Sequence, residues 1–194
     1  VTDAHSRYVL CCAAGVGTTI AEAQEQLEAV FREYGVPRAL RTDNGVPFAG
    51  SGAGRLTRLG VWLMRQELEL VQITKGCPQE NGAHERMHRD LKAETTKPPE
   101  FSLSRQQERF DVWREEYNEV RPHAALELAT PSSWYERSER EYRESPPEPE
   151  YAGWNEVRRV DGRGRLKLGR REYAISEALA GQLVEMEEVD DGEW

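Results

Sequence analysis

Short apolar segments alternate with helix-period patterns over residues 1–135, and this alternation favours a mixed α/β fold. Thr19 and Glu22 form a Thr-x-x-Glu capping box that predicts the start of the first helix, which Gly35 and Pro37 end. The other predicted elements are strand pieces at 1–3 and 8–12, strands at 39–42 and 68–73, a helix marked by Leu56, Leu59 and Leu63, a helix from about 81 to 94, and a helix capped by Ser104 and Gln107 with Phe110, Trp113 and Tyr117 on one face.

Residues 151–194 differ in pattern from the segment before them. Apolar pairs at strand spacing, joined by Gly-rich turns, predict a small β-module. Residues 136–150 are rich in Pro and charge, and they are predicted to form a linker that buries nothing obvious. The predicted domains are a core at 1–135, this linker, and a β-module at 151–194. Because Val1 lies within an expected strand and Trp194 directly follows a turn-like segment, we interpret the chain as a piece of a longer protein, truncated at both ends.

The composition restricts the cellular setting. No apolar run is long enough to span a bilayer, and no signal peptide opens the chain, so we predict no membrane partner. Cys11, Cys12 and Cys77 form no Cys-x-x-Cys pair, which argues against a disulfide framework or a structural zinc site. These observations predict a reducing, cytoplasmic location.

The net charge of −9 counts against a nucleic-acid partner, because nucleic-acid-binding proteins usually present basic surfaces. The excess is uneven along the chain. Residues 1–135 carry 16 basic and 19 acidic side chains, whereas residues 185–193 hold six acids and no base. The core is therefore compatible with DNA, while the acidity of the β-module favours packing or a subunit contact there over direct DNA binding.

Two segments place polar side chains where a site could form. Asp43, Asn44 and Gly45 follow the strand predicted at 39–42, although this tripeptide taken alone favours a simple turn. Further along, a loop containing Gly and Pro leads into the helix predicted at 81–94. That helix places Glu85, Arg89 and Lys92 on one face, apart from its apolar stripe. The face is either a solvated surface with one Glu–Arg pair or a carboxylate flanked by cations that meet phosphates.

The same helix contains the pattern His-Glu-x-x-His at His84, Glu85 and His88, which in zinc proteases supplies two zinc ligands and a general base. Helices with this pattern are normally apolar around it because their zinc site is buried. Here Arg86 and Asp90 lie beside the pattern, and no downstream third ligand is evident. A zinc metalloprotease is therefore a minor alternative.

Four segments in this order resemble the retroviral-type integrase core of bacterial insertion-sequence transposases. They are Thr2-Asp3-Ala4-His5-Ser6-Arg7-Tyr8, Arg41-Thr42-Asp43-Asn44-Gly45-Val46-Pro47-Phe48, the stretch from Pro78 to Lys92, and Tyr117-Asn118 with Arg121-Pro122-His123, Leu126 and Thr130-Pro131. The resemblance covers roughly residues 1–135 and, more weakly, the β-module. It implies an RNase H-like α/β fold with an Asp-Asp-Glu metal site.

In such an enzyme Asp43 matches the second acidic residue and Glu85 the third. The resemblance implies that both hold Mg²⁺ or Mn²⁺, with two ions in the complete enzyme. Arg89 and Lys92 match helix positions that face DNA. Three further residues would shape DNA-binding loops nearby: Asn44, Gln79 and Asn81. The implied partners are DNA, both transposon ends and target, and further copies of the protein in a homo-oligomer.

The first catalytic Asp of the family lies one hairpin upstream of the segment that contains Asp3, so we expect the first strand and its Asp to be missing from this chain. Asp3 itself resembles a structural residue of the second strand, the wrong strand for a metal ligand. The complete enzyme would cut and join DNA, whereas this chain alone is expected to be inactive and of low stability. The alternative hypotheses are a non-catalytic transposase relic and a domain that binds DNA or another subunit.

Overall fold

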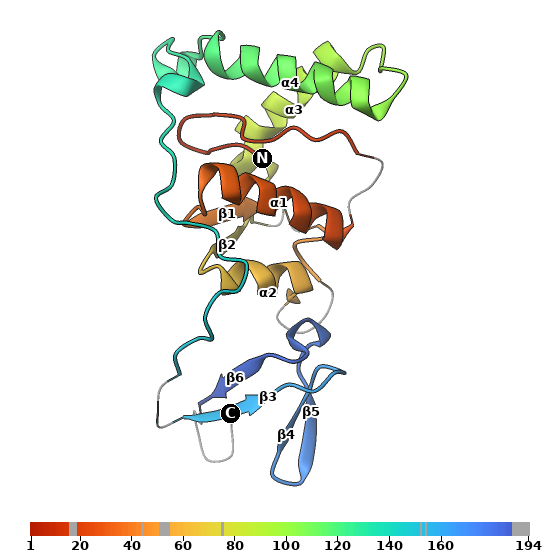
Figure 1. The fold of residues 1–194 in the computed structure, drawn as a ribbon, viewed down its shortest axis with the longest axis vertical. Coiled ribbons are helices and arrows are strands. Elements are labelled where there is room, and N and C mark those ends of the chain that lie inside the picture. The colour runs from red at the N-terminus through yellow and green to blue at the C-terminus, as the bar shows by residue number, and fades with distance from the viewer. Residues whose placement is uncertain are drawn as a thin grey trace. The chain divides into compact units, whose positions relative to one another are not determined.

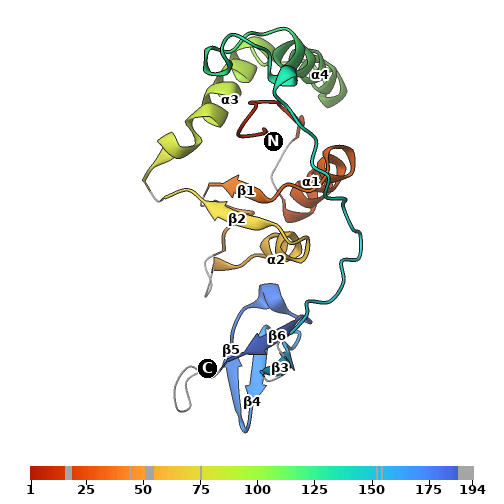
Figure 2. The ribbon, with the colours of Figure 1, turned by 90° about the vertical axis from the view of Figure 1, so that its left-hand side faces the viewer.

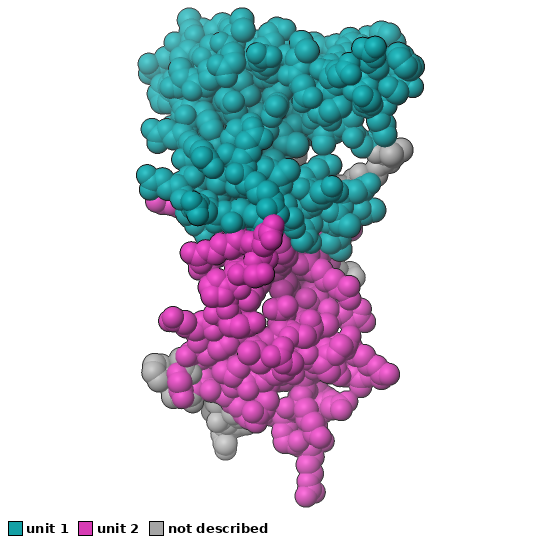
Figure 3. Space-filling view, in the orientation of Figure 1, with its two compact units in different colours: residues 1–37, 72–142 teal, residues 38–71, 143–194 magenta. Residues whose placement is uncertain are grey.

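The computed structural model describes residues 1–15, 19–43, 45–50, 55–74, 76–151, 153 and 155–187 (Figure 1). The chain divides into two compact units (Figure 3). Unit 1 comprises residues 1–37 and 72–142, and unit 2 comprises residues 38–71 and 143–194. Within the described ranges, none of the helices combines the length and the apolar character that crossing a membrane would need.

Three helices form most of unit 1: α1 (Ile20–Tyr34), α3 (Gly82–Thr95) and α4 (Leu103–Glu119). The predicted capping box of α1 is confirmed, because the Thr19 side chain accepts from the Glu22 amide while the Glu22 carboxylate accepts from Thr19. The cap predicted for α4 was wrong. Ser102 accepts from the Arg105 amide and begins the helix two residues before Ser104.

The core of unit 1 forms between α3, α4 and the first residues of the chain. The predicted aromatic face of α4 is buried against the apolar stripe of α3. The cluster consists of Val9, Cys12, Met87, Leu91, Phe110, Trp113 and Tyr117. The exposed fraction of the Trp113 side chain is only 4%, so this residue belongs to the core.

Residues 1–3 and 8–11 pair around a turn, as predicted, although only Thr2 and Val9 form a β-bridge and neither segment is a full strand. The Asp3 amide donates to the Tyr8 carbonyl, and the Leu10 amide donates to the Val1 carbonyl. The Asn118 side chain accepts from the Val9 amide at 2.8 Å and donates to the Val9 carbonyl at 3.0 Å. Gln107 bonds the Ala14 amide and the Cys12 carbonyl in the same way, and Arg114 donates to the Leu10 carbonyl. Side chains of α4 thus form hydrogen bonds with backbone groups that would otherwise need a neighbouring strand as their partner.

The segment after α4 is fixed to α3 by a cationic side chain. Arg121 forms a bidentate ion pair with Glu94, and its guanidinium lies 5.5 Å from the Trp113 ring centroid. This ion pair lowers the pKa of Glu94 below its usual range. A bridge between His123 and Ala129 then closes the following loop. The Tyr-Asn and Arg-Pro-His residues quoted above therefore hold the core of unit 1 together.

Residues 136–142 lie along the end of α1 and are bonded to it at several points. Ser138 donates through its amide to the Tyr34 carbonyl and through its hydroxyl to the Val36 carbonyl, and the Val36 amide donates to the Arg140 carbonyl. Gly35 permits this approach: its φ is +80°, and a Cβ atom there would lie 2.4 Å from the Ser138 carbonyl oxygen. No residue of 136–150 is buried, as predicted, but this part of the segment is attached to the core.

We expect Gly35→Ala to release residues 136–142, because the added methyl meets backbone and the positive φ is strained for alanine. The exposed Arg137 should then become a faster trypsin site, and the amides of Val36 and Ser138 should exchange faster with deuterium. Gly76→Ala is the matched control, since Gly76 has φ +83° but open space around its Cβ position. Equal trypsin cleavage in both variants would show that the contact at Ser138 holds nothing in place.

Unit 2 begins with a strand–helix–strand segment. Strands β1 (Ala39–Thr42) and β2 (Glu69–Gln72) pair in a two-stranded sheet, and α2 (Arg58–Arg65) connects them. Figure 2 shows the arrows of β1 and β2 side by side and pointing the same way, as a crossover through a helix allows. Thr57 caps α2. Both strands and this helix match the predicted alternation.

The described part of the β-module contains four short strands, all close to the predicted apolar pairs. They are β3 (Glu156–Arg159), β4 (Arg165–Leu168), β5 (Arg171–Ala174) and β6 (Leu183–Met186). β3 pairs with β6 and β4 with β5, both antiparallel. Among the described residues of the module, Val160 and Leu166 supply the buried apolar side chains.

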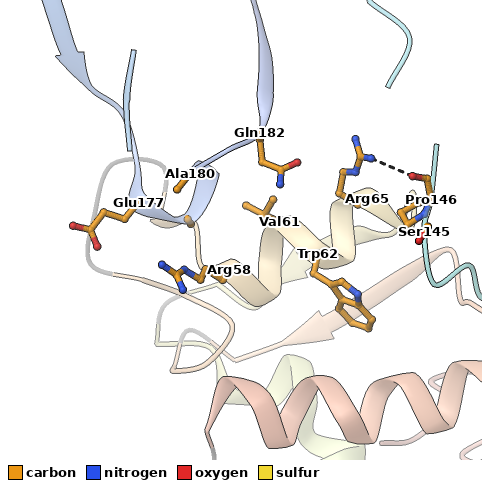
Figure 4. A pocket seen from close by; sticks show the side chains of 10 residues that line it. Arg58, Val61, Trp62, Arg65, Ser145, Pro146, Glu177, Ala180 and Gln182 are labelled. Carbon is orange, nitrogen blue, oxygen red and sulfur yellow. Dashed lines mark hydrogen bonds between the residues drawn. The ribbon is translucent and has the colours of Figure 1, made fainter. Parts of the chain in front are cut away.

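The second half of the predicted linker is attached to α2. Arg65 donates to the Glu148 carboxylate and the Pro146 carbonyl, and the Gln66 amide group donates to the Arg143 carbonyl. Figure 4 shows Arg65 reaching Pro146 beside a cavity of about 670 Å³. α2, residues 145–146 and the turn before β6 line this cavity.

Candidate functional site

Asp43 directly follows β1 in unit 2 and is exposed to solvent. Its Oδ1 accepts from the Gly45 amide at 3.1 Å, which is the local turn that the tripeptide favours. Among the described residues, none donates a hydrogen bond to Oδ2 of Asp43. One carboxylate oxygen is therefore available at the end of the strand. Asn44 lies outside the described residues.

The loop before α3 ends in a 3₁₀ turn, η2 (Pro78–Asn81). Glu80 accepts from the Thr74 amide at 2.9 Å, and this bond closes the loop. Gln79 is exposed and Asn81 is half-buried, and neither side chain caps α3. Both residues therefore stand directly before the helix that carries Glu85.

α3 separates an apolar face from a charged one. Met87, Leu91 and Thr95 are buried, whereas Glu85, Arg89 and Lys92 are all exposed. Their spacing of four and three residues places these three side chains on one helix face. Arg89 lies 3.5 Å from Asp90, a weak pair because the Arg89 side chain is 74% exposed. The face therefore presents one carboxylate and two cations to solvent.

The two histidines of the zinc-protease pattern face a different direction. The His84 Nδ1 lies 3.0 Å from the Thr2 hydroxyl, and the rings of His84 and His88 are 4.5 Å apart. Partial desolvation, then the positive charges of the Val1 amine and Lys92, lower the pKa of His88. His84 thus has a hydrogen-bonding partner in the first residues of the chain.

Asp3 forms a tight local turn. Its Oδ2 accepts from both the amide of Ser6, at 2.7 Å, and the hydroxyl of Ser6, at 2.6 Å. Ser6 is fully buried, and its Oγ in turn accepts from the Tyr8 amide. The carboxylate of Asp3 is therefore occupied in holding the turn that precedes Val9, a structural task.

Asp43 belongs to unit 2 and Glu85 belongs to unit 1. Carboxylate oxygens that are exposed and have few protein partners suit Mg²⁺, which keeps several waters and binds through one or two carboxylates. Among the described residues, no three His, Cys, Asp or Glu side chains are grouped closely enough to hold a metal ion. In chemical type, both carboxylates fit a magnesium ligand set.

Comparison with known proteins identifies the class of fold. Residues 66–131 match the family model described as integrase core domain, and this range includes Gln79, Asn81, Glu85, Arg89 and Lys92. The chain also aligns with a chain of the cryo-electron microscopy structure of the simian T-cell lymphotropic virus intasome in complex with PP2A regulatory subunit B56 gamma. That alignment has a TM-score of 0.50 and 18% identity, and it covers 73% of this chain and 48% of the other.

Two curated proteins from bacterial insertion elements are similar in sequence. An uncharacterized 39.2 kDa protein of insertion element IS476 from Xanthomonas euvesicatoria is 30% identical over 107 residues, which cover 55% of this chain and 29% of that protein. An uncharacterized 31.7 kDa protein of IS407 from Burkholderia multivorans is 30% identical over 109 residues, covering 56% and 37%. The chain thus spans about a third of the length of these relatives.

These findings confirm the predicted resemblance to insertion-sequence transposases with an integrase core, and the RNase H-like α/β fold class. The individual roles of Asp43 and Glu85 stay predictions. The sequence interpretation missed a concentration of basic residues in the β-module, because the charge was counted over the whole of residues 151–194. A count by shorter segments would have found it.

Proposed function

We propose that the complete protein is a DNA transposase that cuts and joins DNA by metal-dependent phosphodiester hydrolysis and strand transfer. The observation that carries this proposal is the exposed face of α3, where Glu85 stands beside Arg89 and Lys92 within the integrase-core match. Such an enzyme would act in the bacterial cytoplasm, at the nucleoid, on transposon ends and target DNA as a homo-oligomer.

In this proposal Asp43 and Glu85 hold Mg²⁺ or Mn²⁺. Bound metal would supply an activated water and charge stabilisation at the phosphate. Arg89 and Lys92 neutralise and position the DNA backbone by contacts that carry no base information. Gln79 and Asn81, together with Asn44, line the approach of the DNA strand as hydrogen-bonding side chains.

The test is a nicking assay with the complete protein and a duplex carrying the ends of its element. We expect Mg²⁺-dependent nicks that Asp43→Asn removes and that His84→Ala/His88→Ala retains. Loss of activity in the double histidine variant, with stoichiometric zinc in the native protein, would instead support the zinc alternative. Complete absence of metal-dependent product from the complete protein would support a relic or a binding domain.

The 194-residue chain alone holds Asp43 and Glu85 as the matched carboxylates, and we expect no strand transfer from it. Mg²⁺-dependent joined product from this chain would contradict the requirement for the first catalytic Asp of the family.

A further inference from the structure

The two histidines of α3 take no part in the proposed magnesium site. His84 is half-buried and His88 is exposed, and they lie one helical turn apart on the same side of α3. Their ring centroids are 4.5 Å apart, with the ring planes tilted by 42°. We call these two side chains the histidine pair. Because His88 is exposed, an ion can reach the pair from solvent.

The ring of His84 is held in place by a hydrogen bond to another segment. Its Nδ1 lies 3.0 Å from the hydroxyl of Thr2. Histidines that bind metals commonly have such a partner at one ring nitrogen, which fixes the orientation of the ring while the other nitrogen faces the ion. Nε2 is therefore the nitrogen of His84 that would bind a metal.

The separation of the rings matches two imidazoles bound to a single ion. A metal–nitrogen bond of about 2.0–2.1 Å places the centre of each ring about 3.2 Å from the ion. Two such rings at right angles around the ion have centroids about 4.5 Å apart, and two rings at a tetrahedral angle have centroids about 5.2 Å apart. The observed 4.5 Å equals the first value, so the histidine pair can bind an octahedral or square-planar ion with little movement.

The first turns of α3 would gain from such a link. Asn81 stands at the N-cap of the helix but makes no capping hydrogen bond with its side chain. The first backbone amides of a helix need acceptors, and without a cap the first turn frays. The histidine pair joins the first turn to the second. An ion bound to both rings would therefore hold together the turns that contain Glu85.

The chemistry of the pair selects the kind of ion. Among the described residues, no third His, Cys, Asp or Glu side chain completes a metal site with the pair, so water would fill the remaining positions. Imidazole nitrogen suits Ni²⁺, Cu²⁺ and Zn²⁺, whereas Mg²⁺ prefers oxygen. The positive charges of the Val1 amine and Lys92 act on His88 and oppose a further cation, so the affinity should be modest.

We propose that the histidine pair binds one first-row transition-metal ion of the Ni²⁺, Cu²⁺ or Zn²⁺ type, and that the ion stabilises the first two turns of α3. This site differs from the zinc-protease alternative, in which a third ligand completes the site and Glu85 acts as a base beside the ion. It uses neither Asp43 nor Glu85, and it does not depend on the proposed function.

The test titrates NiCl₂ into the 194-residue chain, prepared without a polyhistidine tag, by isothermal titration calorimetry. We expect one Ni²⁺ per chain. His84→Ala and His88→Ala should each weaken binding about tenfold or more, because the second imidazole no longer acts at high effective concentration. Saturating Ni²⁺ should raise the thermal unfolding midpoint and slow deuterium exchange in the first two turns of α3. Both effects should be lost in the two variants.

Two controls separate the spacing of the pair from the number of histidines. His88→Ala/Arg89→His keeps two histidines on α3 but places them on different faces, so it should bind Ni²⁺ no better than His88→Ala. His5→Ala removes an exposed histidine from another segment and should bind Ni²⁺ like the native chain. Unchanged affinity in both single α3 variants, or affinity restored by Arg89→His, would overturn the proposal.

Circular dichroism without metal checks that the variants fold. Because the titration contains no DNA, its result is independent of whether the complete protein cuts DNA. A chain that binds Ni²⁺ at the pair and lacks nicking activity would support this inference and contradict the proposed function, and the reverse result would do the opposite.

Discussion

Glu85→Gln in the complete protein is expected to lower Mg²⁺-dependent DNA cleavage by about a thousandfold or more. The substitution keeps the size of the side chain but removes the charge that the proposed metal site needs, and loss of several kcal/mol of metal-dependent stabilisation gives this factor. Among the described residues, Glu85 makes no hydrogen bond or ion pair and is exposed, so its loss should not destabilise the fold. The thermal unfolding midpoint should therefore stay unchanged while single-turnover cleavage falls.

The control is Glu108→Gln, which neutralises an exposed carboxylate on α4 whose ion pair with Arg105 is solvent-screened. It should leave the cleavage rate within about twofold. Residual cleavage by Glu85→Gln within tenfold of the native rate would remove Glu85 from the metal site. DNA binding in EDTA should be retained by this variant, which separates a chemical defect from a binding defect.

Asn118→Leu is expected to destabilise unit 1 by about 2–6 kcal/mol. The Asn118 side chain is 3% exposed and satisfies both the amide and the carbonyl of Val9, so leucine would leave two buried backbone groups without partners. Each such group costs about 1–3 kcal/mol. Urea unfolding at constant m-value gives the free energy of unfolding, and deuterium exchange at the Val9 amide locates the loss.

Gln107→Leu provides a graded comparison, because Gln107 makes the same kind of bond pair to Ala14 and Cys12 from a half-buried position. Water can replace these bonds in part, so its cost should be about 1 kcal/mol. If both substitutions lower the free energy of unfolding equally, burial does not determine how much these hydrogen bonds stabilise unit 1. Faster exchange at Val9 should appear only in Asn118→Leu.

The local patterns of the sequence predicted most helices and strands, since each depends on residues close in sequence. The capping box at Thr19, the strand before Asp43 and the four strands of the β-module all follow from periodicity and turn residues. The face of α3 with Glu85 was equally predictable, because spacing alone places residues on a helix surface. Its chemical role depended on the resemblance to transposases.

Contacts between distant segments could not be read from those patterns. Residues 8–12 have the composition of a strand, yet the backbone groups of Val9 and the Leu10 carbonyl are satisfied by polar side chains of a helix far along the chain. The cap of α4 was misplaced because Ser102 and Ser104 are both plausible caps, and only the backbone decides between them. The basic residues of 155–175 were missed because their charge was summed with that of the acidic residues of 176–194.

The bond between Val9 and Asn118 also constrains how the chain is made. The two residues are 109 positions apart, so the Val9 amide and carbonyl lack their Asn118 partner until α4 has been synthesised. At the usual speed of translation, roughly 5–20 residues per second, that interval is about 5–20 s. During this time Val9 and Cys12 are exposed on an unfinished chain, where chaperones and proteases can reach them. Unit 1 must therefore complete its fold late in synthesis, when its first and last segments meet.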